Sequence, residues 1–118
     1  MTQQSRLYDT TEFSGWLRKQ EQIDSKIGFI TSDIDYVWNN YNTGKWCFIE
    51  EKRYMAKPEF PQRKIFKMLN KVAKCDPNYR GFHLIQFERT SPEDGNVYID
   101  NKLVSKEQLI DWLVSIVR

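Results

Sequence analysis

A block of charged residues ends an apolar run between residues 45 and 54, which reads Lys-Trp-Cys-Phe-Ile-Glu-Glu-Lys-Arg-Tyr. If this run is a β-strand, alternate side chains share a face, so Glu50 and Lys52 lie on the same face as Trp46 and Phe48. Burial of an unpaired charge among large apolar groups is costly. We therefore expect Glu50 and Lys52 to have partners, or a bound metal ion.

The preceding predicted strand supplies two acidic candidates, Asp33 and Asp35. Across a hairpin, Asp35 comes close to Glu50. Two carboxylates suit Mg²⁺, a hard cation that prefers oxygen ligands. Lys52 could orient a water molecule or offset the charge that develops on a phosphate. These parts fit metal-assisted phosphodiester hydrolysis, while a solvent-exposed cross-strand pair of Glu50 and Lys52 is the alternative interpretation.

The same residues resemble the PD-(D/E)XK nuclease superfamily. The resemblance rests on Ser32-Asp33-Ile34-Asp35-Tyr36-Val37, a turn, and then Phe48-Ile49-Glu50-Glu51-Lys52. That family places an Asp on one strand and a Glu-x-Lys on the next, within a restriction-endonuclease-like core of a helix, three strands, a helix and a strand. The resemblance covers roughly residues 10–87.

The resemblance implies a role for each matching residue. Asp35 and Glu50 would be the metal carboxylates, Lys52 the catalytic lysine, and the backbone carbonyl of Glu51 would also face the metal. Asp33 has the same parity as Asp35 and would be either a supporting group or the true ligand. Gln62 resembles a helical glutamine that some branches place beside the active site. Some members also use a glutamate of the first helix, for which Glu12 and Glu21 are candidates.

The charge distribution points separately to nucleic acid. Residues 52–80 hold nine Lys or Arg against two acidic residues, a net charge of +7, while the rest of the chain carries −5. Such a dipolar chain suits a phosphate backbone near an acidic site. The residues expected to contact nucleic acid are Arg63, Lys64, Lys67 and Lys71. A solvated helix face is the alternative interpretation of this stripe.

The predicted elements place these residues on a small mixed sheet with helices on its faces, an α/β or α+β sandwich. We expect helices over 10–22, 61–74 and 105–117, strands over 27–30, 34–38, 45–54, 82–87 and 97–99, and turns over 39–44 and 91–95. The apolar face of the helix over 61–74 is predicted to comprise Ile65, Phe66, Met68, Leu69, Val72 and Ala73. A capping box of Ser105 and Gln108 begins the last helix.

The length of 118 residues predicts one domain over 1–118, in which a short strand and a helix over about 96–118 follow the nuclease-like core. No apolar run is long enough for a membrane helix, and no secretory signal is visible. Two cysteines and one histidine are too few for a Cys/His zinc site. Reduced cysteines and a cytoplasmic location are the default expectation.

Together these features predict a nuclease that uses Mg²⁺ or Mn²⁺ to hydrolyse DNA through a metal-activated water. The alternatives are a non-catalytic nucleic-acid-binding module and a protein-interaction module on the same fold. A homodimer would suit cleavage of two strands, and a targeting partner would suit so small a core. Duplex, single-stranded, nicked and branched DNA, and RNA, are all compatible with the pattern.

Overall fold

The computed structural model describes residues 12–28 and 32–118. The chain divides into two compact units, Met1–Thr31 and Ser32–Arg118. The first unit contains the helix α2 (Glu12–Arg18), followed by two 3₁₀ turns, η1 (Glu21–Ile23) and η2 (Ser25–Ile27). The helix predicted over 10–22 is therefore confirmed over Glu12–Arg18 and wrong over 19–22, where the α-helix has ended and η1 begins. Its predicted start at residues 10–11 lies outside the described residues.

The strand predicted over 27–30 is wrong at Ile27, which belongs to the 3₁₀ turn η2. Asp24 caps this turn by accepting a hydrogen bond from the Lys26 N–H at 2.7 Å. Gly28 then ends the turn in a left-handed conformation, with φ of 104°. A local side-chain cap thus overrides the strand propensity of the isoleucine. Residues 29–31 lie outside the described residues.

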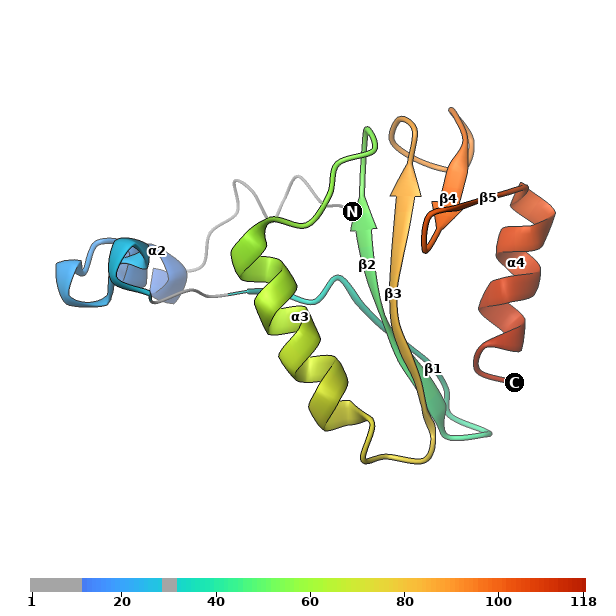
Figure 1. Ribbon diagram of the computed structural model, residues 1–118, viewed down its shortest axis with the longest axis horizontal. Coiled ribbons are helices and arrows are strands. Elements are labelled where there is room, and N and C mark those ends of the chain that lie inside the picture. Colours follow the sequence, from blue (N-terminus) through green and yellow to red (C-terminus); the bar gives the residue numbers. More distant parts are fainter. Residues whose placement is uncertain (1–11, 29–31) are drawn as a thin grey trace. The chain divides into compact units, whose positions relative to one another are not determined.

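The second unit is an α+β structure built on a five-stranded mixed sheet with strand order β1-β2-β3-β4-β5 (Figure 1). The strands are β1 (Tyr36–Asn40), β2 (Lys45–Lys52), β3 (Tyr79–Phe87), β4 (Val97–Ile99) and β5 (Lys102–Val104). β2 and β3 are parallel, and the other neighbouring pairs are antiparallel. The helix α3 (Phe60–Ala73) connects β2 to β3, and α4 (Lys106–Ser115) follows β5.

Five strands are predicted and the described residues contain five, but the two sets differ. β5 was not predicted, and the strand predicted over 27–30 is not among the five strands observed. β5 has only three residues, two of them exposed, so its pairing with β4 rather than its own pattern defines it. Asn39 and Asn40, predicted as turn residues, extend β1, and the strand predicted over 45–54 ends at Lys52.

The two helices pack on opposite faces of the sheet. On the α3 face, the ring of Phe66 stacks on Phe82 at a centroid distance of 4.6 Å, and Phe82 packs against Phe48. On the other face, Leu109 of α4 packs into the main core with Ile49 and other buried residues of the sheet. The side chains of β2 thus alternate between the two faces of the sheet, as predicted.

The apolar face predicted for α3 is only partly correct. Phe66 is buried, but Met68 and Val72 are 53% and 66% exposed. The helix lies on a sheet surface, and only its inner residues reach that surface, so two apolar side chains remain on the outside. By contrast, the capping box of α4 is confirmed, because Ser105 and Gln108 exchange side-chain to backbone hydrogen bonds.

No helix among the described residues combines the length and apolar character that a membrane span requires.

Candidate active site

Asp35 lies directly before β1, beside the end of β2. The register pairs Tyr36 with Ile49, which places Asp35 next to Glu50 across the hairpin. Asp35 Oδ2 accepts a hydrogen bond from the Glu51 N–H at 2.8 Å. The predicted proximity of Asp35 to β2 is thus confirmed, whereas Asp33 is exposed two residues earlier.

The Glu50 carboxyl group is buried, with 3% of the residue exposed. Its Oε2 lies 3.4 Å from Lys52 Nζ. Its Oε1 is also buried and has no hydrogen-bond donor among the described residues. Burial, and next the charge of Asp35, raise the pKa of Glu50 to about 7, against the lowering effect of Lys52. Near neutral pH this carboxyl group therefore needs a proton or a cation to satisfy it.

Lys52 is the last residue of β2, and its side chain contacts the start of α3. Its Nζ donates a hydrogen bond to Gln62 Oε1 at 3.1 Å, and the Glu59 N–H donates to the same oxygen at 3.2 Å. Gln62 thus closes the capping box that begins α3 and also fixes the lysine. The prediction that Gln62 points inward agrees with its contact to Lys52.

Gln86 is a polar residue of the same region that the sequence analysis missed. It is 2% exposed, pairs with Lys52 across β2 and β3, and donates to the Ala56 carbonyl at 2.9 Å. This contact holds the segment between Lys52 and α3. The available signal was a glutamine that follows Leu84 and Ile85 and precedes Phe87, with the same parity as Phe82 on the face toward α3.

The donor set fits a divalent cation bound by few protein ligands. No group of three or more His, Cys, Asp or Glu side chains lies together in the part of the chain that the structure describes. Asp35 and Glu50 therefore supply two carboxylates at most. Because the N–H and C=O of a strand residue point to the same neighbouring strand, the Glu51 carbonyl lies on the Asp35 side. Mg²⁺ prefers oxygen ligands and usually keeps several waters, so the chemistry of these few oxygen atoms is compatible with it.

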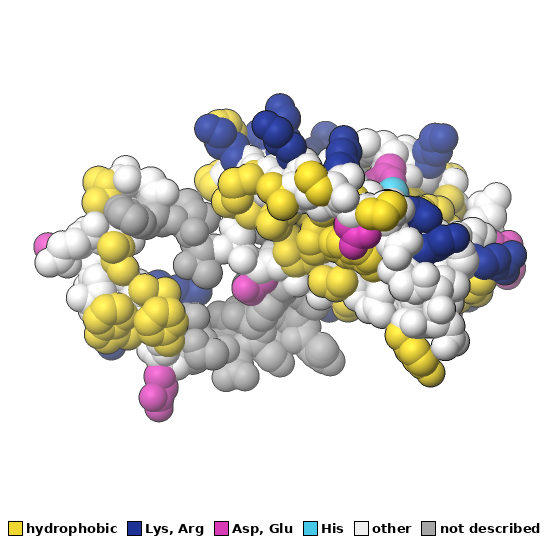
Figure 2. Space-filling model, turned by 90° about the horizontal axis from the view of Figure 1, so that it is seen from below, with side chains coloured by type: hydrophobic (Ala, Val, Ile, Leu, Met, Phe, Trp, Pro, Cys, Tyr) yellow, Lys and Arg dark blue, Asp and Glu magenta, His cyan; other side chains and the backbone are white. Residues whose placement is uncertain are grey.

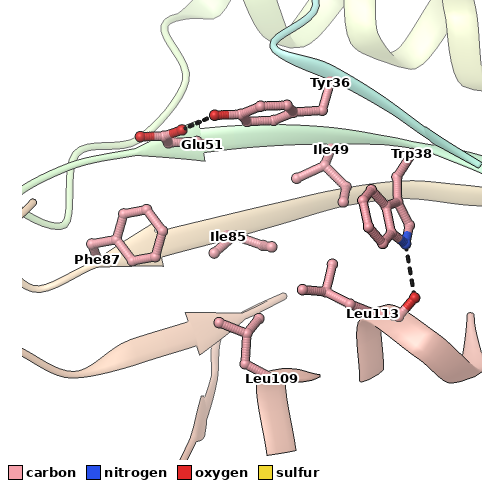
Figure 3. Close-up of a pocket in the computed structure, with 8 residues that line it drawn as sticks. All are labelled: Tyr36, Trp38, Ile49, Glu51, Ile85, Phe87, Leu109 and Leu113. Carbon is pink, nitrogen blue, oxygen red and sulfur yellow. Dashed lines mark hydrogen bonds between the residues drawn. The ribbon is translucent and has the colours of Figure 1, made fainter. Parts of the chain in front are cut away.

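The Glu51 side chain points to the opposite face of the sheet. It accepts a hydrogen bond from the Tyr36 hydroxyl at 2.7 Å and lies 3.4 Å from Arg53 Nε. There it borders an apolar pocket of about 220 Å³ between the sheet and α4 (Figure 3). The Trp38 N–H donates to the Leu113 carbonyl at one end of this pocket. The Glu51 side chain is therefore separated from the group formed by Asp35, Glu50 and Lys52.

The basic residues of α3 lie on its outer surface. Arg63, Lys64, Lys67 and Lys71, here called the basic face, are all exposed. Several Lys and Arg side chains gather along one edge of the molecule in the space-filling view (Figure 2). Gln62 and Phe66, in contrast, face the sheet. One helix thus presents its inner side to the acidic site and its outer side, with the cations, to solvent.

The remaining predicted residues, Glu12 and Glu21, belong to the first unit. Both are exposed there, and their proposed part in the site stays a prediction.

No family model matches this sequence, and no solved structure matches the fold. A protein of Archaeoglobus fulgidus, itself uncharacterised, is 38% identical over 93 residues. The match covers 75% of this chain and 61% of that protein. This chain thus spans less than two thirds of the length of its relative.

Proposed function

We propose that this protein is a Mg²⁺-dependent nuclease of the PD-(D/E)XK type that hydrolyses phosphodiester bonds in DNA. The observation that carries the proposal is the state of Glu50. It is a buried carboxyl group beside Asp35 and 3.4 Å from Lys52, and one of its oxygens lacks a hydrogen-bond donor among the described residues. A cation between two carboxylates satisfies such a group.

Asp35, Glu50 and the Glu51 carbonyl would hold the ion. The chemistry that Mg²⁺ would supply there is activation of a water molecule and stabilisation of charge on the phosphate. Glu50 must release its proton for the ion to bind, and with a pKa of about 7 it does so near neutral pH. Activity should therefore rise as the pH increases through about 7.

In this proposal Lys52 acts on the reacting phosphate. Glu50 Oε2 at 3.4 Å and Gln62 Oε1 at 3.1 Å hold its ammonium beside the carboxylates. A fixed positive charge at this point would offset negative charge that develops on the phosphate in the transition state. Gln62 is a positioning residue in this scheme, because it acts through Lys52.

The order of elements supports a restriction-endonuclease-like core. A helix, the hairpin of β1 and β2, the helix α3 and the parallel strand β3 follow one another in the described residues. Two strands rather than three precede α3 there. The acidic site lies at the end of the hairpin, and the basic face is on the helix that follows it.

The experiment is a cleavage assay with Mg²⁺ and with Mn²⁺ on linear, nicked and branched DNA. Lys52→Met keeps the stem of the side chain and removes its charge. We expect cleavage to fall by at least a hundredfold, equivalent to about 3 kcal/mol of transition-state stabilisation, while DNA binding is retained. Lys102→Met, at an exposed position on β5, is the matched control and should cleave like the wild type.

Equal cleavage by wild type and Lys52→Met would show that Lys52 has no catalytic role. If the wild type cleaves none of the substrates but binds them in a salt-dependent manner, the protein is a non-catalytic nucleic-acid-binding module instead.

A further inference from the structure

We infer that residues 53–60, here called the aromatic segment, form a stacking platform for unpaired nucleotides next to the proposed active site. The protein would then prefer nucleic acid with a single-stranded stretch at the site over continuous duplex. This inference rests on the proposed function for its place beside the scissile phosphate, but the binding that it predicts does not require cleavage.

Tyr54 is displayed to solvent by an unusual backbone. Tyr54 and Met55 both adopt left-handed conformations, with φ of 55° and 56°, which side-chain-bearing residues rarely do. The Tyr54 and Met55 N–H groups donate to the carbonyls of Arg89 and Phe87, each at 2.9 Å, and fasten this turn to the end of β3. The Tyr54 side chain gains little burial from this arrangement, since 68% of the residue is exposed. The hydrogen-bonded turn therefore presents an exposed aromatic ring two residues after Lys52.

Phe60 is a second exposed ring, at the start of α3. It is 55% exposed. Arg63 and Lys64 lie over its ring, at 5.8 Å and 5.3 Å from the centroid. Both cations come from the next turn of the helix, at positions i+3 and i+4. Phe60 thus combines an exposed ring, on which a base can stack, with two adjacent positive charges that suit phosphate.

The aromatic segment connects Lys52, which carries the proposed catalytic ammonium, to Gln62, which accepts a hydrogen bond from it. It begins directly after Lys52 and ends two residues before Gln62, whose side chains are 3.1 Å apart. Gln86 anchors its middle through the Ala56 carbonyl. Both rings thus belong to the segment that joins Lys52 to Gln62 rather than to a distant loop.

The positive charge of the aromatic segment and of the first turn of α3 suits a polynucleotide. Residues 53–64 contain Arg53, Lys57, Arg63 and Lys64 against a single acidic residue, Glu59. Exposed rings interleaved with cations are the arrangement that binds single strands, because every base offers a π-face and every nucleotide a phosphate. In a continuous duplex the bases are already stacked on one another, so the rings would add nothing to its binding.

The test measures binding without cleavage, in EDTA, by fluorescence anisotropy of a labelled oligothymidylate and of a blunt duplex of equal length. The variants are Tyr54→Asn, which tolerates the left-handed backbone, and Phe60→Ala. Each should weaken single-strand binding by about tenfold and change duplex binding by less than about twofold. Phe60→Trp should restore single-strand binding. The slope against salt should not change, because no phosphate contact is lost.

The matched control is Tyr41→Ala. Tyr41 is 90% exposed at the opposite end of β2, so this variant removes an exposed ring away from the site. It should bind both substrates like the wild type. An equal loss in Tyr41→Ala, a parallel loss on duplex, or no loss in either test variant would overturn the inference.

Cleavage assays separate this inference from the proposed function. Selective single-strand binding that depends on both rings, in a protein that cleaves nothing, would support the platform and refute the nuclease. Mg²⁺-dependent cleavage of DNA with a single-stranded stretch that is insensitive to both ring variants, in binding as in cleavage, would support the nuclease and refute the platform.

Discussion

Glu50→Gln should stabilise the protein near pH 8 and have little effect near pH 4. Burial, followed by the charge of Asp35, raises the pKa of Glu50 from 4.5 to about 7. The folded protein therefore holds this proton more tightly than the unfolded chain does. The stability that protonated Glu50 contributes is fully present below pH 4.5 and is lost as the pH rises through 7. At 1.36 kcal/mol per pH unit, the loss amounts to roughly 3 kcal/mol.

Glutamine is uncharged at every pH, so the variant does not incur this loss. The pKa of about 7 already includes the lowering effect of Lys52, so the ion pair needs no separate correction. The net gain near pH 8 should therefore be roughly 3 kcal/mol in the free energy of unfolding. Near pH 4 Glu50 is mostly protonated in both states, and the two proteins should be equally stable within about 0.5 kcal/mol.

The assay is urea unfolding of both proteins, without divalent cations, at several values between about pH 4 and pH 8. The difference between the two curves reports Glu50 together with the groups that interact with it, Asp35 and Lys52, while groups elsewhere in the protein cancel. Glu93→Gln, at a side chain that is 68% exposed, is the control and should give a nearly constant difference. A constant difference for Glu50→Gln would refute the account of a buried, destabilised carboxylate.

Added Mg²⁺ extends the same experiment. A cation that binds the folded state alone stabilises it in proportion to RT ln(1 + [L]/Kd). We expect Mg²⁺ to stabilise the wild type near pH 8 and to have a much smaller effect on Glu50→Gln. Equal stabilisation of both proteins would exclude Glu50 as a ligand.

The remaining predictions concern the basic face and His83. Replacing the three lysines of the basic face with Gln should weaken DNA binding on all sequences and reduce the salt slope by up to about 0.9 per lost contact, which salt titrations of binding will measure. The two nitrogens of His83 lie 2.7 Å from Asp100 Oδ2 and from the Arg80 carbonyl, and only the imidazolium can donate to both. Burial lowers the pKa of His83, but these hydrogen bonds outweigh that effect and raise it. The stability from this pair is present below about pH 6.5 and is lost as the pH rises through the folded-state pKa. Asp100→Asn should remove most of this dependence in thermal unfolding.

Local pattern alone determined which face of β2 carries Glu50 and Lys52. Side chains alternate along any strand, so the placement needs no knowledge of what packs there, and the structure confirms it. The same holds for α3, predicted over 61–74 and found at Phe60–Ala73, and for the capping box of Ser105 and Gln108. These features depend on residues within a few positions of one another.

Tertiary packing decided the features that depend on distant partners. β5 exists because β4 offers hydrogen bonds to it, and Met68 is exposed because the sheet reaches only one side of α3. The role of Gln86 depends on the Ala56 carbonyl, thirty residues away in the chain.

For the chemistry of the site as well, some features follow from the sequence and others only from the tertiary structure. The sequence placed a carboxylate and a lysine on one face and an aspartate nearby. Burial of Glu50, its raised pKa, and the hold of Gln62 on Lys52 appear only in the folded chain. Charge and residue type are local properties, whereas desolvation and electrostatic coupling depend on everything that surrounds a group in three dimensions.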